Sequence, residues 1–195
     1  MQRKTFNNMN CSIARALDQI GEWWSLLIVR ECTFGTTRFD QFQERLGIAR
    51  NILTNRLKRL IDVGILEKVA LGENDRRAGY RLTQKGEELF PVLVALLQWG
   101  DKWGMSLDGP PIRLVEHATG EPLAAVGPYS SSGRLLGIRD VRMEVGPGGT
   151  PSTEAVVAAR NLAILGAGSE PLAEAGGQAA QGSAPARKPR AVKEG

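Results

Sequence analysis

The sequence predicts a fold of the α+β class that is mainly α-helical, and two observations predict it. Apolar residues recur at steps of three and four through most of residues 11–63 and again through 84–103, which is the period of helices that bury one face. Between these regions, residues 65–71 and 80–83 are β-prone and enclose a polar loop with a glycine at each end, a pattern typical of a β-hairpin. Helices therefore come first, a hairpin follows, and a long helix closes this part of the chain.

The first helical region covers residues 11–32 and has one apolar stripe. Gly21 is expected to divide it into a short helix and a longer one that includes residues 23–30, because glycine weakens the interior of a helix. Residues 34–37 are typical of a turn. Thr37, at the end of that turn, is a candidate N-cap for the next helix.

Two short amphipathic helices come next, joined by a tight turn. Residues 38–46 carry apolar side chains along one edge, Gly47 ends this helix, and residues 51–63 bury a second apolar face up to Gly64. Two such helices with a glycine-containing turn are typical of a helix-turn-helix. The hairpin that follows directly corresponds to a wing, so the elements together predict a winged helix-turn-helix.

Three parts are predicted along the chain. Residues 1–107 form the winged unit, which ends in a helix over 84–103 that Pro91 is expected to kink slightly. Residues 108–149 form a small β-rich appendage, and residues 150–195 form a linker and a largely disordered C-terminal tail rich in Ala, Gly, Pro and Ser. The elements expected after residue 108 are β-like pieces at 112–115, 123–126 and 141–145 and a helix at 154–165.

The charge distribution indicates that the winged unit has a polyanionic partner. The chain has a formal net charge of +4. Residues 1–107 carry all of it, with 16 Lys and Arg against 12 Asp and Glu, whereas the remaining residues carry nine of each kind. A surplus of positive charge confined to one domain favours nucleic acid as its partner.

Composition also indicates the compartment. Two cysteines are too few for a disulfide scaffold and favour a reducing environment. The first residues lack the apolar core of a signal peptide, and the most apolar run, residues 89–99, is too short to span a bilayer. We therefore expect a soluble cytoplasmic protein without membrane association.

The second helix of the helix-turn-helix has the properties of a DNA-reading helix. An α-helix fits the major groove of B-DNA, where Asn suits adenine and Arg or Lys suits guanine. Opposite the apolar stripe of residues 51–63 lies a polar face, flanked by Arg59 and preceded by Arg50. A merely solvated helix face is the alternative interpretation. The residues expected to read bases on this face are Asn51, Thr54, Asn55 and Lys58.

Three further arginines are candidates for contacts with the sugar-phosphate backbone of DNA. Arg76 and Arg77 lie at the predicted tip of the wing, where cations contact phosphates or enter the minor groove. Glu73 and Asp75 partly neutralise that tip, so an ordinary soluble loop is the alternative. Arg38, at the start of the first helix of the motif, is a weaker candidate for a phosphate contact.

Over residues 21–93 these motifs resemble the HxlR-type transcriptional regulators. The resemblance rests on Cys11, the G-x-W-W-S-L-L-I segment that begins at Gly21, the Arg56-Leu57-Lys58-x-Leu60 pattern, and the Tyr80-x-Leu82-Thr83-x-x-Gly86 pattern. It implies a homodimer that binds double-stranded operator DNA with a two-fold repeat. The end helices would form the dimer contact. A repressor is expected rather than an activator, and the effector is left open. Plain core packing of the last helix is the alternative to dimerisation.

The chain departs from the family pattern in two places. Ala49 stands where such proteins commonly have a Ser or Thr helix cap, a loss that costs about 1 kcal/mol. The appendage resembles a small zinc ribbon found in some family members, but Thr119, Tyr129 and Ser132 stand at its cysteine positions. Because no thiolates are present there, we expect no metal and no cofactor.

The residues that could support catalysis or sensing are one histidine and two cysteines. The only histidine, His117, has no nucleophile near it in sequence, so we expect no enzyme. Cys11 begins a predicted helix, where thiols are more reactive, and some members of the resembled family sense oxidants at this place. A small structural residue near the dimer contact is its alternative, and Cys32 is expected to be buried and inert. A winged-helix protein-interaction module without operator binding is the alternative function, and small-molecule binding beside the last helix also stays open.

Overall fold

A computed structural model of the chain describes residues 5–6, 8–72, 78–104 and 109–166. In this structure α1 (Ser12–Ile20) and α2 (Trp23–Thr33) come first, separated at Gly21 as predicted. The helix-turn-helix follows as α3 (Phe39–Leu46) and α4 (Arg50–Asp62), with Gly47 between them at a positive φ of 61°. This left-handed conformation favours glycine and ends α3.

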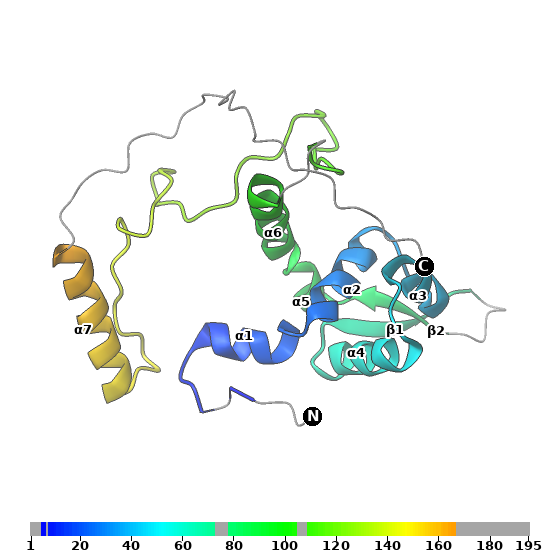
Figure 1. The fold of residues 1–195 in the computed structure, drawn as a ribbon, viewed down its shortest axis with the longest axis horizontal. Coiled ribbons are helices and arrows are strands. Elements are labelled where there is room, and N and C mark those ends of the chain that lie inside the picture. Colours follow the sequence, from blue (N-terminus) through cyan, green and yellow to red (C-terminus); the bar gives the residue numbers. More distant parts are fainter. Residues whose placement is uncertain (1–4, 7, 73–77, 105–108, 167–195) are drawn as a thin grey trace, which may run out of the picture.

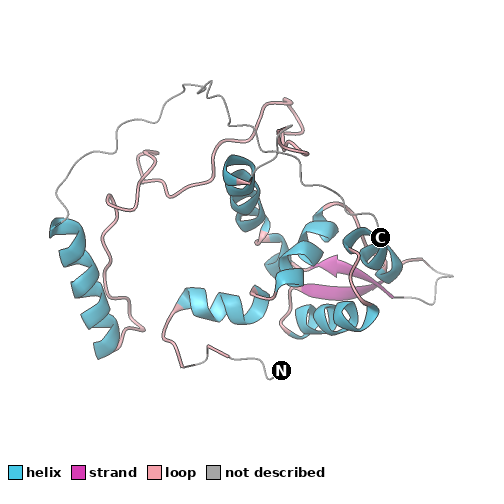
Figure 2. Ribbon diagram, in the orientation of Figure 1, coloured by secondary structure: helices cyan, strands magenta, loops and turns pink. Residues whose placement is uncertain are grey.

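The wing is a two-stranded antiparallel sheet of β1 (Leu66–Ala70) and β2 (Ala78–Leu82). Its register pairs Leu66 with Leu82 and Ala70 with Ala78. Figures 1 and 2 show the sheet packed beside α3 and α4. The predicted fold class, mainly helical with a winged helix-turn-helix, is therefore confirmed for this unit.

The core of the unit lies where α2, α3, α4 and β1 meet. Leucines from α4, the aliphatic residues of α2 and the first residues of the wing exclude solvent almost completely. Such close-packed apolar contact holds α4 rigidly against the rest of the unit. The largest fully buried side chains are Phe42, Ile28, Leu53, Leu57, Leu60, Ile65 and Leu66.

One buried charge joins α2 to α3. The Glu31 carboxylate, 4% exposed, lies 2.6 Å from Arg30 Nη2 and 3.5 Å from Arg45 Nη1, and it accepts a 3.2 Å hydrogen bond from Thr36 Oγ1. A buried carboxylate needs such partners, because removing it from water without them is costly. The cluster fixes the turn that leads into α3.

The N-cap of α3 differs from the prediction. Arg38 occupies the cap position, and its backbone N–H donates to Gln41 Oε1 at 3.3 Å. Thr37 was the predicted cap, but its carbonyl oxygen accepts a 2.8 Å hydrogen bond from the Tyr80 N–H of β2. Thr37 is therefore extended alongside the wing, which moves the start of the helix one residue onward.

The predicted helix over residues 84–103 is divided in two. A short α5 (Gln84–Glu87) and a longer α6 (Phe90–Trp103) are separated at Glu88 and Leu89. Pro91 is in the first turn of α6 and has no N–H to donate to the carbonyl four residues before it, so a continuous helix cannot form here. The expected slight kink is thus a break.

The appendage does not form the three predicted strands. Among its described residues, 109–150, pairing is limited to single bridges between Val115 and Pro122 and between Tyr129 and Leu135. The β-like pieces are short, are separated by Gly, Pro and Ser, and leave apolar side chains such as Ile138 exposed. Without a neighbouring strand to pair with, β-prone residues stay irregular.

The predicted helix at 154–165 is confirmed as α7 (Pro151–Gly166) and begins earlier, with proline at its start. Figure 1 shows residues 109–150 running as a long arc toward α7, whose start lies near the N-terminal segment, where Asn10 Nδ2 donates to the Gly148 carbonyl at 2.8 Å and to Thr153 Oγ1 at 3.4 Å. Asn161 holds α7 to this arc by a two-way pair of hydrogen bonds with the backbone of Met143, at 2.9 and 2.8 Å. The disordered tail that the sequence predicts, from 167 onward, lies outside the described residues.

Candidate nucleic-acid interface

The outward face of α4 carries the polar residues that the sequence analysis selected. Leu53, Leu57 and Leu60 bury the opposite face, so the helix cannot rotate without exposing them. Together with helical periodicity, this directs one polar set away from the core. The residues that line an open hollow of about 520 Å³ at the start of α4 are Arg50, Asn51, Thr54 and Asn55.

Most polar groups on this face have no partner within the chain. Asn51, Asn55 and Lys58 are exposed and make no hydrogen bond or ion pair with any residue that the structure describes. Thr54 differs, because its Oγ1 donates to the Arg50 carbonyl at 2.8 Å. Its hydroxyl oxygen and methyl group are what it offers to a ligand, so Thr54 is suited to accept a hydrogen bond or contact a thymine methyl.

The start of α4 also leaves backbone donors available. Ala49 is the N-cap and makes no side-chain cap hydrogen bond. A helix leaves its first N–H groups without intrahelical partners, and with the helix dipole these favour an anion such as phosphate. The missing cap noted in the sequence therefore lies next to the hollow formed by the polar face.

Arg50 is held in place by an aromatic ring from the neighbouring helix. Its guanidinium carbon lies 5.1 Å from the centroid of the Phe39 ring, a cation–π contact. Arg50 and Arg38 together line a second hollow of about 230 Å³, which Leu71 and Ala78, at the loop end of the two strands, complete. Arg38 lies 3.5 Å from Asp40, so part of its charge is compensated.

Arg59 flanks the exposed face, as the sequence indicated, and its guanidinium group contacts α1. Its Nη2 donates to the Asp18 carbonyl oxygen at 3.3 Å, and the side chain is half-buried against α1. Arg56, which belongs to the family-like pattern of this helix but was not among the predicted DNA contacts, lies on the same side and pairs with Glu22 at 2.8 Å. Both arginines flank the leucine stripe of α4, and this flanking position was the available sign that they would contact other helices.

The wing is described only at its base. Arg76 and Arg77, the predicted tip, lie outside the described residues. Arg81, in β2, donates two hydrogen bonds to Glu67 of β1, at 3.0 and 2.6 Å, and is thereby engaged within the hairpin. The described cations beside the polar face are Arg38 at the N-cap of α3 and Arg50 and Lys58 of α4.

The two cysteines lie in different environments. Cys11 is the N-cap residue of α1 and is partly exposed. For Cys32, burial, together with the nearby Glu31 charge, raises the pKa of the thiol to about 12. Cys32 is thus protonated at neutral pH, and its predicted inertness is supported because the thiolate is the reactive form.

The residues at the positions that correspond to zinc-ribbon cysteines make local hydrogen bonds. Thr119 Oγ1 donates to Glu116 at 2.6 Å, and the Tyr129 hydroxyl donates to the Ala125 carbonyl at 2.7 Å. Within the ranges that the structure describes, no group of three or more His, Cys, Asp and Glu residues is arranged to hold a metal ion. Across those ranges, also, no helix is long and apolar enough to cross a membrane.

Comparison with known proteins gives the context of this geometry. Residues 19–108 match the model of the HxlR-like helix-turn-helix family. An uncharacterized HTH-type transcriptional regulator of Mycobacterium bovis is 42% identical over 137 residues, which cover 70% of this chain and 87% of that protein. The similarity to it extends well beyond the winged unit.

Two solved structures resemble about three quarters of this chain. PA1607, described as a candidate transcription factor, has a TM-score of 0.67 at 40% identity and covers 72% of this chain and 99% of its own. PA1374 of Pseudomonas aeruginosa, described in the same way, has a TM-score of 0.52 at 35% identity and covers 75% and 99%. Given the family match, these relatives and the winged helix-turn-helix, the chain belongs to the HxlR-like helix-turn-helix family of transcriptional regulators.

Proposed function

We propose that the protein is a homodimeric repressor that binds an operator with two-fold symmetry through the polar face of α4. The observation that carries this proposal is the set of Asn51, Asn55 and Lys58, exposed and unpartnered within the described chain beside an arginine held on Phe39. These side chains are the donors and acceptors that base edges in the major groove require. Arg38, and beyond the described residues Arg76 and Arg77, are proposed to contact phosphates.

A second copy would cover the apolar surface of α6 and α1. Trp99 and Trp103 of α6 are 66% and 63% exposed, and Ile13 of α1 is 72% exposed. Large apolar side chains that are exposed in the single chain mark interaction surfaces when they form a contiguous patch. A dimer also suits the target, since one winged helix contacts only one half-site and two-fold proteins bind two-fold operators.

The operator proposal is tested by fluorescence anisotropy on labelled DNA from upstream of the protein's own gene. Binding is expected to weaken steeply with salt, because phosphate neutralisation releases counterions. Asn55→Ala is expected to lower affinity for that DNA more than for a scrambled duplex, whereas Arg142→Ala in the exposed part of the appendage should leave both unchanged. Binding that is insensitive to salt, or an Asn55→Ala variant with full affinity, would contradict operator reading.

The direction of regulation is tested in cells with a reporter driven by the same upstream region. If the protein represses, Asn55→Ala raises reporter output and Arg142→Ala does not. A fall in output with Asn55→Ala would instead indicate activation. An interaction module without operator binding predicts equal output from both variants and from the unchanged protein.

Cys11 is proposed to sense oxidants or electrophiles. Its position at the N-cap of α1 and its partial exposure support this role, and α1 is also held to α4 through Arg59. Diamide is expected to weaken DNA binding of the unchanged protein and not of Cys11→Ser. Equal responses to diamide would leave Cys11 with a structural role at the dimer contact.

A further inference from the structure

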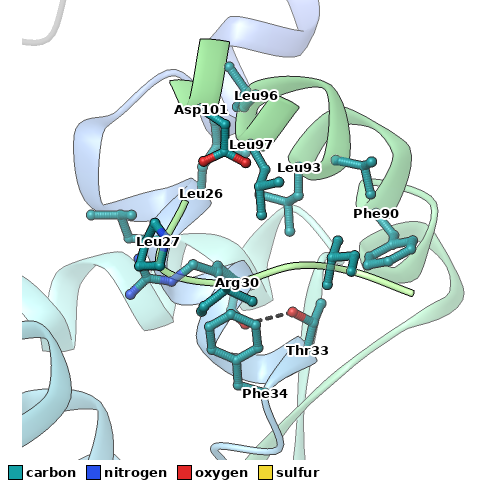
Figure 3. Close-up of a pocket in the computed structure, with 14 residues that line it drawn as sticks. Leu26, Leu27, Arg30, Thr33, Phe34, Phe90, Leu93, Leu96, Leu97 and Asp101 are labelled. Carbon is teal, nitrogen blue, oxygen red and sulfur yellow. Dashed lines mark hydrogen bonds between the residues drawn. The ribbon is translucent and has the colours of Figure 1, made fainter. Parts of the chain in front are cut away.

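An apolar cavity of about 340 Å³ lies between α2, α6 and the first segment of the appendage. Figure 3 shows side chains of α2 and α6 facing one another across it, with Phe34 and Phe90 toward one end and Asp101 toward the other. Residues 111–114 supply part of the wall. Cavities of this size with predominantly apolar walls are typical sites for small organic molecules.

The wall formed by the appendage is anchored on α6. Gln98 Nε2 donates to the Ala124 carbonyl at 2.9 Å, and the Val126 N–H donates to Gln98 Oε1 at 2.8 Å. This two-way pairing satisfies both ends of the side-chain amide and holds the irregular segment against the helix. The cavity is therefore formed by elements of a single chain.

One polar group in the wall lacks a partner. Arg30 lines the cavity, and its Nε is buried without a hydrogen-bond partner in the structure. Its Nη2 is engaged by Glu31 at 2.6 Å, but Glu31 also serves Arg45, so the cluster keeps an uncompensated positive charge. The Nε itself is not accessible, but the Arg30 side chain is 40% exposed, so its other guanidinium N–H groups can donate to an oxygen atom of a ligand in the cavity.

The aromatic side chains define the other part of the ligand. The Arg30 guanidinium carbon lies 5.7 Å from the centroid of Phe34, and Phe90 also lines the cavity. Flat apolar groups pack well against such rings. Asp101, the other ionisable residue of the wall, comes from the end of α6, so an acidic ligand would direct its acid toward Arg30.

We propose that this cavity binds a small monocarboxylic acid with an aromatic body, its carboxylate accepting hydrogen bonds from Arg30. The regulatory consequence rests on the proposed function: Ile28 and Val29 of α2 belong to the same buried core as Leu53 and Leu57 of α4. A ligand that displaces α2 would therefore alter the position of the DNA-reading helix. The acid acts as an effector, and binding itself requires no DNA.

The test is isothermal titration calorimetry of the full chain with 2-naphthoate and with its neutral counterpart 2-naphthalenemethanol. The acid is expected to bind once per chain and roughly tenfold more tightly than the alcohol, the effect of one charge-assisted hydrogen bond. Arg30→Lys keeps a cation beside Glu31 but removes the planar guanidinium and its paired N–H donors, so it should weaken the acid roughly tenfold and leave the alcohol unchanged. Arg142→Lys is the matched control and should bind both as before.

A second variant fills the space without touching Arg30. Leu97→Phe is expected to weaken the acid and the alcohol alike, and its thermal melt shows whether it folds. Equal affinity for acid and alcohol, unchanged binding by Arg30→Lys, or no saturable binding at millimolar ligand would overturn the proposal. If binding is absent and Leu97→Phe converts a dimer to a monomer in sedimentation, a second copy occupies the cavity. DNA anisotropy without ligand tests the operator proposal independently.

Discussion

Lys58 and Arg59 are adjacent cations on α4, and replacing each by alanine should affect a different property of the protein. Lys58→Ala should affect DNA binding, whereas Arg59→Ala should affect the free energy of unfolding. Lys58 is exposed and has no partner in the described chain, so its removal should change the free energy of unfolding by about 0.5 kcal/mol or less. In a dimer the same change removes two cationic contacts to DNA. The slope of log affinity against log salt should then become shallower by about 1.8, since each phosphate contact contributes about 0.9.

Arg59→Ala should act on stability instead. The change removes the hydrogen bond from Nη2 to the Asp18 carbonyl, whose charged donor places it at about 1.5–3 kcal/mol. The Arg59 Nε is already buried without a partner, so deleting the side chain also relieves a cost, and we expect a net loss of about 1–2 kcal/mol. The salt slope of DNA binding should stay as in the unchanged protein.

Urea unfolding and salt-dependent fluorescence anisotropy measure the two quantities on the same preparations. We predict that Lys58→Ala alters only the salt slope of DNA binding and that Arg59→Ala alters only the unfolding midpoint. If Arg59→Ala made the slope shallower while stability stayed constant, Arg59 would contact DNA and its assignment to the α1 contact would be wrong. A destabilised Lys58→Ala would equally refute the assignment of Lys58 to a free surface.

Three further predictions follow from burial and packing. Trp99→Glu should shift the protein from dimer to monomer in analytical ultracentrifugation, because a charge would replace an apolar side chain that is 66% exposed in the single chain. A dimer that persists in this variant would place the dimer contact elsewhere. In the folded protein the pKa of the Cys32 thiol is raised to about 12 from the ordinary value of 9.0, so its stabilising contribution is complete below pH 9 and is lost as pH rises from 9 to about 12. The free energy of unfolding of Cys32→Ala should therefore fall less than that of the unchanged protein over the lower part of that window. Parallel pH profiles of the two proteins would count against burial of the thiol. Gly86→Ala should lower the melting temperature, since an added Cβ would overlap the Ile65 carbonyl oxygen, and an unchanged melting temperature would mean that the α5 turn can move aside.

The sequence alone was sufficient for the order of elements in the helix-turn-helix and its wing. Helices with an apolar face, glycines such as Gly47 and Gly64 at their ends, and an alternating hairpin are all local patterns, because side-chain direction repeats every 3.6 residues in helices and every two in strands. The polar set Asn51, Thr54 and Asn55 followed from the same periodicity. These features were therefore predictable without knowing which elements pack together.

Tertiary structure decided what local patterns leave open. Lys58 and Arg59 have the same charge and adjacent positions, but only Arg59 reaches the carbonyl at the end of α1. Ile112 and Leu114 belong to a β-prone segment, yet they line a cavity together with side chains of α2 and α6. A side chain's role depends on the neighbour that it meets across space, and hydrophobic periodicity states only which face is inward.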